Sequence, residues 1–313
     1  MKKILITGGF GYLGAHFTEW FCRQDGWEVV VLTFPGEIRR STANFRILQA
    51  DIAEGEDLKR ILDEPFDYCI HAASVNDSFV PGYPETALRV NAGGTRNLLD
   101  AMQGRGLKRL VYLSTIHVYG ASNGRIDENA PPAPTNDYAL THWFAEQYVR
   151  MFQRRHDLPY VILRMTNVYG APCHIDSSKW YLVLNDFARM AHDRKEIVIK
   201  SNGRARRDFI WVGDVCRIIE RLLTAPEAVH QTLNVGAGRT LAIIELAELV
   251  KDVCQRRYGV PVAIRINEQD KTVYPETQVD CTRLRTIVGS EMHDQFKEEI
   301  GRIFDLLDAE PAG

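Results

Sequence analysis

Two side chains that can exchange protons, Tyr138 and His142, stand four residues apart in the run Asp-Tyr-Ala-Leu-Thr-His-Trp-Phe-Ala-Glu at positions 137–146. Residues at i and i+4 share one face of a helix, so both side chains can point at a single ligand. Glu146 continues the same stripe further along. We interpret this helix face as part of a redox site.

A glycine-rich loop supplies the next candidate residues. Between an apolar run and a helical pattern the chain reads Thr-Gly-Gly-Phe-Gly-Tyr-Leu-Gly, which places glycines at positions 8, 11 and 14. A pyrophosphate must come close to backbone N–H groups at a helix N-terminus, where a side chain at Gly8 or Gly11 would block it. The loop therefore predicts a dinucleotide-binding turn, and a tight turn without a ligand is the alternative.

Composition favours a small ligand as the partner. The chain has 313 residues, a formal net charge of −3 and 45% apolar content, so we expect neither nucleic acid nor a membrane as the partner. No apolar run is long enough to cross a membrane, and we expect a cytoplasmic protein. The 6 cysteines are scattered without a Cys-x-x-Cys pair, and we expect no metal site.

The elements that must position these residues alternate along the first half of the chain. Apolar runs predict strands, and residues with helical spacing predict helices between them. Strands are expected at 3–7, 28–33, 45–49, 67–71, 109–114 and 160–164, and helices at 13–24, 86–102 and 138–155. Strands that alternate with helices pair in parallel through crossover connections, so we predict an α/β fold with a doubly wound parallel sheet, the Rossmann fold.

The pattern changes after residue 165. A helix is expected at 176–192, a brief strand at 196–200 and an amphipathic helix at 241–257. We predict a dinucleotide-binding Rossmann domain over 1–165 and a smaller, mixed α/β lobe over 166–313 that mainly binds the substrate. Within 205–236, Phe209–Trp211 and Leu233–Val235 are candidates to return to the first sheet.

Several motifs, taken in chain order, resemble those of the extended short-chain dehydrogenase/reductase family, the nucleotide-sugar epimerases and dehydratases. The start, Gly11–His16, is especially similar to UDP-galactose 4-epimerases. The further matching stretches are Asp51-Ile52, His71-Ala72-Ala73, Asn91 with Gly94-Thr95, Leu113–Gly120, Arg164–Gly170, Arg207–Ile210 and Asn234–Gly236. The resemblance implies a nicotinamide cofactor and a nucleotide-sugar substrate.

The resemblance also implies which residues bind the cofactor. They are Gly8, Phe10, Gly11, Tyr12, Leu13, Gly14, Thr33, Asp51, Ile52, His71, Ala72, Ala73, Asn91, Tyr138 and His142. NAD is the expected cofactor. The second strand ends in Thr33-Phe34 rather than in an acidic residue that would bind a free ribose 2′-hydroxyl. Arg39 and Arg40 could receive a 2′-phosphate, so NADP is the alternative.

In the family's chemistry a tyrosinate removes the proton of a sugar hydroxyl while a hydride passes to the nicotinamide. The matching residues are Tyr138 as the base and Thr115 as the hydrogen-bonding partner of the hydroxyl or ketone. His142 stands where the family has a lysine that holds the ribose and lowers the tyrosine pKa. A tyrosine must drop by about 3 pKa units, or roughly 4 kcal/mol, to ionise at neutral pH. His142 gives weaker electrostatic help unless a neighbour such as Glu146 raises its pKa. Neutral His142 can still hydrogen-bond the ribose or relay a proton.

Three functions fit these residues. The first is a working enzyme, an epimerase or a C4 oxidoreductase. A 4,6-dehydratase is disfavoured, because Ile116 and His117 follow Thr115 at the place where the family's dehydratases have an Asp-Glu pair. The second is a catalytically weak or silent protein that binds the nucleotide or cofactor. The third is a structural role in an assembly. His117 is either an additional acid/base or a loop residue that faces solvent.

The expected substrate contacts are Thr115, Asn167 and Arg207, because the planar guanidinium of an arginine matches phosphate oxygens. The family often has a further phosphate-binding arginine in an Arg-x-Gly-Asp segment. The corresponding region here reads Asn-Glu-Gln-Asp-Lys at 267–271. Lys271 or Arg265 could substitute for that arginine.

A homodimer is expected from the resemblance alone, through the helices at 86–102 and 138–155. The residues that could form its seam are Leu99, Phe144, Tyr148 and Phe152. Apolar residues at helical spacing could equally belong to the intramolecular core.

Overall fold

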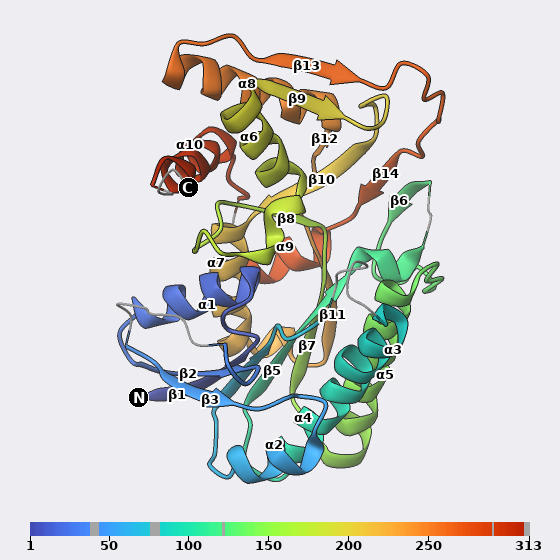
Figure 1. Ribbon diagram of the computed structural model, residues 1–313. Helices are drawn as coiled ribbons and strands as arrows, with labels where there is room; N and C mark the ends of the chain where they lie inside the picture. Colours follow the sequence, from blue (N-terminus) through green and yellow to red (C-terminus); the bar gives the residue numbers. More distant parts are fainter. Residues whose placement is uncertain (38–43, 76–81, 121–122, 290, 310–313) are drawn as a thin grey trace.

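The computed structural model describes residues 1–37, 44–75, 82–120, 123–289 and 291–309, and a seven-stranded sheet forms its centre (Figure 1). Every neighbouring pair of strands in this sheet runs parallel. From edge to edge the strands are β3 (Arg46–Gln49), β2 (Trp27–Thr33), β1 (Lys2–Thr7), β4 (Tyr68–His71), β5 (Arg109–Thr115), β7 (Tyr160–Met165) and β11 (Gln231–Val235). Strand order reverses between β1 and β4, and the predicted doubly wound Rossmann fold is confirmed.

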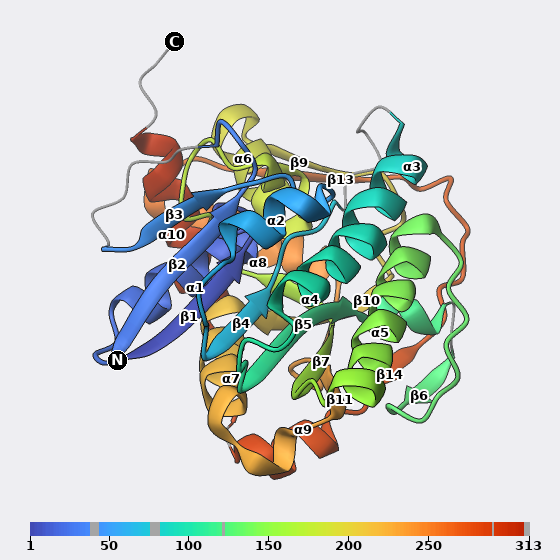
Figure 2. The same cartoon turned by 90° about the horizontal axis from the view of Figure 1, so that it is seen from below.

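Helices cover both faces of the sheet because neighbouring residues of its strands carry apolar side chains to opposite sides. Ile4 of β1 packs with α1 (Tyr12–Cys22), α7 (Val212–Thr224) and α9 (Thr282–Val288). Leu5 packs on the other face with α2 (Gly55–Ile61), α4 (Thr95–Met102) and α5 (Asp137–His156), which lie side by side in Figure 2. Among the described residues, no helix is both long and apolar enough to cross a lipid bilayer.

Three small sheets form mainly from the chain beyond β7, and the third also includes β6, which precedes β7. They pair β12 (Thr240–Ala242) with β10 (Arg206–Trp211) and β8 (Asn167–Tyr169), β13 (Ala263–Ile266) with β9 (Glu196–Ile199), and β14 (Thr277–Val279) with β6 (Gly124–Ile126). Three helices pack with them around a separate apolar core, above the seven-stranded sheet in Figure 1. These helices are α6 (Val183–Arg194), α8 (Ile243–Tyr258) and α10 (Phe296–Asp308).

The helix expected over 86–102 is interrupted. It comprises α3 (Tyr83–Ala87), a π-helical segment (Leu88–Gly94) and then α4. The segment passes so close to the loop after β3 that a Cβ at Gly94 would lie 2.7 Å from the side chain of Ile52. A wider helical turn is a common local adjustment within an α-helix, and it was not visible in the apolar spacing.

Two other expectations from the second half were wrong. The helix expected over 176–192 begins only at Val183, after a short 3₁₀ turn at Ser178–Tyr181. Ser177 caps this turn by accepting a hydrogen bond from the N–H of Lys179 at 3.3 Å. Phe209–Trp211 does not return to the first sheet, because β10 pairs with β8 and β12 instead. Leu233–Val235 does return, as part of β11 beside β7.

The proposed dimer seam is largely internal. Leu99 and Phe152 are 1% and 4% exposed and belong to the core beneath α4 and α5, so their expected place at a subunit interface is wrong. Phe144 is 39% exposed and Tyr148 is half-buried. Apolar spacing alone could not separate the face that packs on the sheet from a face that meets a partner.

A buried carboxylate ties α5 to two strands of the sheet. Glu146 is fully buried, and its two oxygens accept hydrogen bonds from Nε and Nη2 of Arg164 in β7 at 2.9 and 2.7 Å. Ser114 of β5 donates a further hydrogen bond to Glu146 at 2.7 Å. Two-point pairing with an arginine compensates for the desolvation of both charges. The contact therefore fixes α5, and with it Tyr138, relative to the ends of β5 and β7.

We expect Arg164→Met to lower the free energy of unfolding by about 3–5 kcal/mol, because the buried carboxylate of Glu146 then loses its two-point partner and keeps only the single ionic contact with Arg150 at 3.2 Å. Urea unfolding followed by circular dichroism measures the change. Arg154→Met, at an exposed position on α5, is the control and should change stability by less than about 0.5 kcal/mol. Equal stability losses in the two variants would show that the buried pair does not hold the helix.

Candidate active site

A cavity of about 450 Å³ opens at the carboxyl ends of the central strands, next to the point where strand order reverses. Open parallel sheets bind ligands at this place. The wall on the side of the sheet comprises Gly8, Gly11, Tyr12, Leu13, Gly14, Ala72, Ser74, Leu113, Ser114, Thr115, His117, Tyr138 and His142. The opposite wall comprises 165–169, Lys179, 181–185, Arg207 and Phe209. The cavity thus lies between the seven-stranded sheet and the elements beyond β7.

The glycine loop has no room for side chains. A Cβ at Gly14 would lie 2.0 Å from the carbonyl oxygen of Gly8. A Cβ at Gly8, where φ is +65°, would lie 2.8 Å from the Cα of Ala73. α1 begins directly after Gly11, and Gly11 itself lines the cavity at the helix N-terminus. Backbone N–H groups at the positive end of the helix dipole are thus open to the cavity, which fits the pyrophosphate of a dinucleotide.

His71 is buried at the end of β4, with 1% of its surface exposed. The hydroxyl of Thr95 gives its proton to the carbonyl of Asn91 at 2.5 Å, so it accepts from Nε2 of His71 at 2.9 Å. Nδ1 of His71 then accepts from the hydroxyl of Thr7 at 2.7 Å. Burial lowers the pKa of His71 to about 3, so the ring is neutral. Its neighbour Ala72 is the residue that reaches the cavity wall.

Two other residues expected at the cofactor have places in the core. The ring of Phe10 is buried and lies 5.9 Å, centroid to centroid, from that of Phe45. Thr33 is 3% exposed at the end of β2. Arg39 and Arg40, the expected receivers of a 2′-phosphate, lie outside the described residues.

The remaining expected cofactor residues organise the loops beside the sheet. Asp51 follows β3 and is half-buried, and Ile52 is buried against Gly94. The side chain of Asn91 binds the backbone of Val75 twice, accepting from its N–H at 2.7 Å and donating to its carbonyl at 2.9 Å. Asn91 therefore fixes the segment that follows β4, which contributes Ala72 to the cavity.

Thr115, Tyr138 and His142 meet on the cavity wall, as the sequence predicts. Thr115 ends β5, and the other two residues lie in the first turns of α5. The side chain of Asn136 caps the N-terminus of α5, because its oxygen accepts a hydrogen bond from the N–H of Ala139 at 2.9 Å. The interaction with Thr115 lowers the pKa of the Tyr138 phenol, against the larger effect of burial. The rings of Tyr138 and His142 have centroids 4.4 Å apart. The helical spacing therefore does bring both side chains to one ligand site.

His142 is neutral in this site. Its Nδ1 donates to the carbonyl oxygen of Tyr138 at 2.8 Å, which leaves Nε2 as an acceptor. Burial lowers the pKa of His142 to about 4, and the charge of Glu146 offsets only part of this effect. Glu146 is held instead by Arg164 and Ser114. The positive charge that a lysine would bring to this position is therefore missing at neutral pH.

The phenol of Tyr138 is protonated at neutral pH. Burial raises its pKa above the ordinary value near 10, and the hydrogen bond with Thr115 offsets only part of the shift. Tyr138 can therefore donate a hydrogen bond, but it becomes a base only when another charge stabilises its phenolate.

The outer wall contributes polar groups that the sequence indicated only in part. Arg207 is exposed to the cavity and forms no ion pair within the described ranges, whereas Asn167 is held by its Nδ2, which donates to the backbone of β10 at 2.9 Å. Lys179 lies 2.8 Å from the hydroxyl of Tyr181. Asn185 is 1% exposed, and its Oδ1 has no hydrogen-bond partner among the described residues. Lys179 and Asn185 were missed because their segment was expected to be one regular helix.

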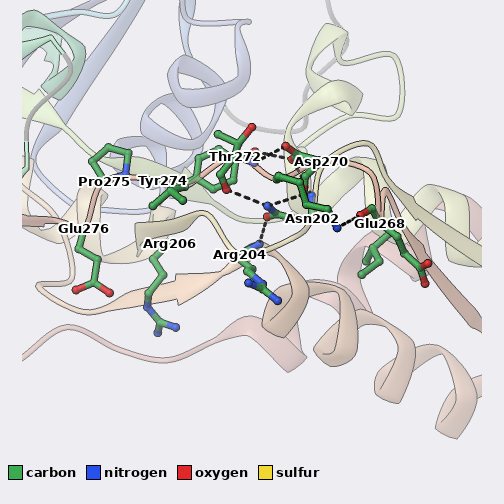
Figure 3. Close-up of a pocket in the computed structure, with 12 residues that line it drawn as sticks. Asn202, Arg204, Arg206, Glu268, Asp270, Thr272, Tyr274, Pro275 and Glu276 are labelled. Atoms are coloured by element: carbon green, nitrogen blue, oxygen red, sulfur yellow. Dashed lines mark hydrogen bonds between the residues drawn. The ribbon is translucent and has the colours of Figure 1, made fainter.

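A second cavity, of about 520 Å³, lies beside β10 and is drawn in Figure 3. Its walls include Asn202, Arg204, Arg206, Asp270, Lys271 and Tyr274. Arg206 and Arg207 are neighbours on a strand, so their side chains point to opposite faces, one toward each cavity. Lys271 lines this second cavity and Arg265 pairs with Glu196, so neither residue takes the place of the Arg-x-Gly-Asp arginine at the first cavity.

The glycine loop at the first helix is suited to bind a dinucleotide, and a tyrosine and a threonine line the same cavity at the carboxyl end of the parallel sheet. This combination defines an oxidoreductase of the Rossmann class. Residues 4–236 match the model of the NAD dependent epimerase/dehydratase family. The chain belongs to this family, and the resemblance drawn from its motifs is confirmed.

The relatives of the chain act on nucleotide sugars. It is 30% identical over 302 residues to a dTDP-glucose 4,6-dehydratase of Streptomyces niveus, which covers 92% of this chain and 87% of the relative. A UDP-glucose 4-epimerase from Thermotoga maritima, solved with UDP-glucose, superposes with a TM-score of 0.83 at 23% identity and covers 98% of both chains. A UDP-glucuronic acid 4-epimerase from Bacillus cereus, solved with UDP-glucuronic acid and NAD, superposes with a TM-score of 0.81 at 20% identity. The match covers 98% of this chain and 99% of that structure.

We expect the imidazole of His142 to stay neutral between pH 8 and about pH 5 in the native protein, because burial lowers its pKa to about 4. NMR titration of the labelled histidine rings, with His142→Gln to assign the signal, measures this. In the unfolded chain the ring titrates near pH 6.5, so this group's contribution to stability is lost as pH falls from about 6.5 toward 4. A native midpoint above pH 6 would contradict the neutral assignment.

Proposed function

We propose that this protein binds NAD and a nucleotide-activated sugar and oxidises or reduces the sugar at C4, most simply as an epimerase or as an oxidoreductase. The observation that carries the proposal is the placement of the hydroxyl of Thr115 and the phenol of Tyr138 together on the wall of the cavity that the glycine loop also lines. Such a pair can move the proton of one sugar hydroxyl while the carbon beside it exchanges a hydride.

The cofactor would be held by the loop between β1 and α1. Gly8, Gly11 and Gly14 leave the helix N-terminus open to a pyrophosphate, and Ala72 lines the cavity beside them. The family is NAD-dependent, which supports NAD as the cofactor of this chain. When bound, NAD would supply the acceptor or donor of the hydride.

The substrate would be held by the opposite wall. Arg207 and Lys179 bring two cations to the cavity, which would bind a diphosphate, with Asn167 beside them. The buried Oδ1 of Asn185 lacks a partner and would accept a hydrogen bond from a hydroxyl or N–H group of the nucleotide. Thr115 would bind the oxygen at the reacting carbon. These groups favour a nucleoside diphosphate sugar over a neutral sugar.

Tyr138 would hold the proton of the reacting hydroxyl, and Thr115 would orient the oxygen. His142 would act through Nε2 as a hydrogen-bond acceptor for a ribose hydroxyl, because its Nδ1 proton is already committed to a backbone carbonyl. A neutral imidazole cannot lower the pKa of Tyr138 as an ammonium group would. The rate of sugar oxidation should therefore rise with pH well above neutrality.

C4 chemistry without dehydration fits the site better than 4,6-dehydration. Ile116 and His117 follow Thr115, where the dehydratases that this chain resembles have an acidic pair. The aliphatic side chain of Ile116 has no proton to give to a departing hydroxyl. The similarity to a bacterial dehydratase therefore supports the substrate class more than that reaction.

We also propose that residues 1–165, together with β11, bind the cofactor and that residues 166–313 mainly bind the substrate. The return of β11 to the seven-stranded sheet and the origin of Arg207, Lys179 and Asn185 beyond β7 support this division. We further propose a cytoplasmic homodimer, for which the exposed Phe144 on α5 supplies an apolar contact.

A catalytically weak protein that binds the cofactor is the second candidate function. The neutral His142 favours it, because no lysine charge assists Tyr138 and burial raises the pKa of the phenol. Bound NAD without turnover of any UDP-, dTDP-, GDP- or CDP-sugar up to pH 10 would identify this second function.

We expect Gly11→Val to weaken NAD binding by at least about tenfold, because its side chain would fill the space at the helix N-terminus. Isothermal titration calorimetry with NAD measures the affinity. Gly301→Val in α10 is the control, since a Cβ there meets nothing within 4 Å, and it should leave the affinity unchanged. An unaltered affinity in Gly11→Val would remove the pyrophosphate from this loop.

We expect Tyr138→Phe to lower kcat/KM for UDP-glucose or dTDP-glucose by about 10²–10⁴-fold, because the variant cannot accept the hydroxyl proton. Product analysis by NMR and absorbance of reduced nicotinamide measure the rate. Tyr148→Phe on the same helix is the matched control and should retain turnover. Unchanged turnover in Tyr138→Phe would rule out the proposed proton transfer.

We expect His142→Lys to move the rising limb of the rate–pH profile to lower pH by about 1–3 units. A full positive charge beside the phenol favours its ionised form and lowers its pKa. The pH dependence of kcat/KM measures the shift. A limb at the same pH in both proteins would mean that Tyr138 does not set the rate.

A further inference from the structure

The loop that follows β2 turns back on the end of that strand. Pro35 and Gly36 occupy the two central positions of a tight turn. The turn closes with a hydrogen bond from the N–H of Glu37 to the carbonyl oxygen of Phe34 at 3.1 Å. Gly36 has a φ of +88°, which a type II turn requires at its third residue, and proline is favoured at the second. The chain therefore reverses within four residues and carries Glu37 back toward the strand.

A side-chain hydrogen bond fixes the carboxylate of Glu37 at the end of β2. Oε2 of Glu37 accepts from the hydroxyl of Thr33, the last residue of the strand, at 2.9 Å. Thr33 is 3% exposed, whereas Glu37 is exposed to solvent. A carboxylate has two oxygens with about four lone-pair sites, so the contact with Thr33 leaves Glu37 able to accept hydrogen bonds from a ligand.

The end of β2 lies beside the glycine loop, where the cofactor would bind. The N–H of Gly8 donates to the carbonyl oxygen of Leu32 at 2.8 Å, so the loop and the strand end are in direct contact. In dinucleotide-binding Rossmann folds, an acidic side chain at this strand end accepts a hydrogen bond from the 2′-hydroxyl of the adenosine ribose. The strand of this chain ends in Thr33 instead, but the turn brings a carboxylate to Thr33 from four residues further along.

The carboxylate is not needed to form the turn. The reversal is closed by a hydrogen bond between backbone groups, and its conformation follows from Pro35 and Gly36. A turn that served only to reverse the chain would accept almost any residue at position 37. The placement of a carboxylate on Thr33, next to the glycine loop, therefore points to a ligand.

We propose that Glu37 binds the 2′-hydroxyl of the adenosine ribose and makes the protein select NAD over NADP. This inference rests on the proposed function, because NAD is the proposed cofactor. A carboxylate accepts a hydrogen bond from a free hydroxyl but repels a 2′-phosphate, so one side chain favours the first nucleotide and disfavours the second. Thr33 is the positioning residue, because its hydroxyl holds the carboxylate at the strand end.

Binding of the two nucleotides without any sugar tests the proposal, and isothermal titration calorimetry measures both dissociation constants. The wild-type protein should bind NAD at least about 30-fold more tightly than NADP. Glu37→Gln should reduce this ratio to less than about threefold, chiefly through tighter binding of NADP, because the amide carries no charge. Thr33→Val keeps the size of the side chain but removes the hydrogen bond, and it should reduce the ratio by about threefold to tenfold.

Glu28→Gln is the matched control, because Glu28 lies near the opposite end of the same strand, and it should keep the wild-type ratio. Equal ratios in the wild-type protein and in folded Glu37→Gln would overturn the proposal without bearing on the chemistry at C4. A wild-type protein that binds NADP as tightly as NAD would overturn it as well. Binding of neither nucleotide would contradict the proposed function together with this inference.

Discussion

The buried contact of Glu146 with Arg164 and Ser114 governs the geometry of the whole site. A carboxylate with no exposed surface must keep its hydrogen bonds, so α5 cannot slide along the sheet without breaking a charged pair in the core. Ser114 and Thr115 are consecutive in β5, one directed to the carboxylate and the other to the cavity. The same contact that anchors the helix therefore sets the distance between Thr115 and Tyr138.

Three ionisable side chains lie on one face of α5, and their surroundings differ. Tyr138 and the buried His142 both line the cavity, and Glu146 lies in the core. Because the carboxylate is shared between Arg164 and Ser114, little of its charge is available to keep His142 protonated. The site therefore places the hydroxyls of Thr115 and Tyr138 beside a neutral imidazole and not beside a cation.

The sequence predicted the parts of the structure that depend on local pattern. The strand, glycine loop and helix at the start of the chain were recognised because the turn admits no side chain at Gly8 or Gly14. The spacing of Tyr138 and His142 predicted their shared face correctly. What spacing could not give was the protonation of His142, which depends on burial by residues far apart in the chain.

The residues of the outer cavity wall were harder to predict from the sequence, for a physical reason. Lys179 and Asn185 lie in and after a short turn held by side-chain contacts with the backbone, which leave no regular period in the sequence. Phe209–Trp211 looked like a strand for the first sheet, but strand partners are chosen by tertiary packing, and β7 already pairs with β11. Arg207 was identified because the stretch Arg207–Ile210 resembles a family motif and because a planar guanidinium matches phosphate oxygens.

Transfer of an isotope from sugar to cofactor tests the central claim, that this cavity exchanges a hydride at C4 of a nucleotide sugar. The protein is incubated with NAD and with UDP-glucose or dTDP-glucose deuterated at C4, then denatured, and the released nicotinamide nucleotide is analysed by mass spectrometry. NMR of the recovered sugar completes the measurement. The account predicts either deuterium in reduced nicotinamide, from a net oxidation, or the C4 epimer of the sugar with its deuterium retained, from an epimerase, and faster conversion at alkaline pH than at pH 7. An unlabelled cofactor together with an unchanged sugar, for both substrates up to pH 10, would contradict it.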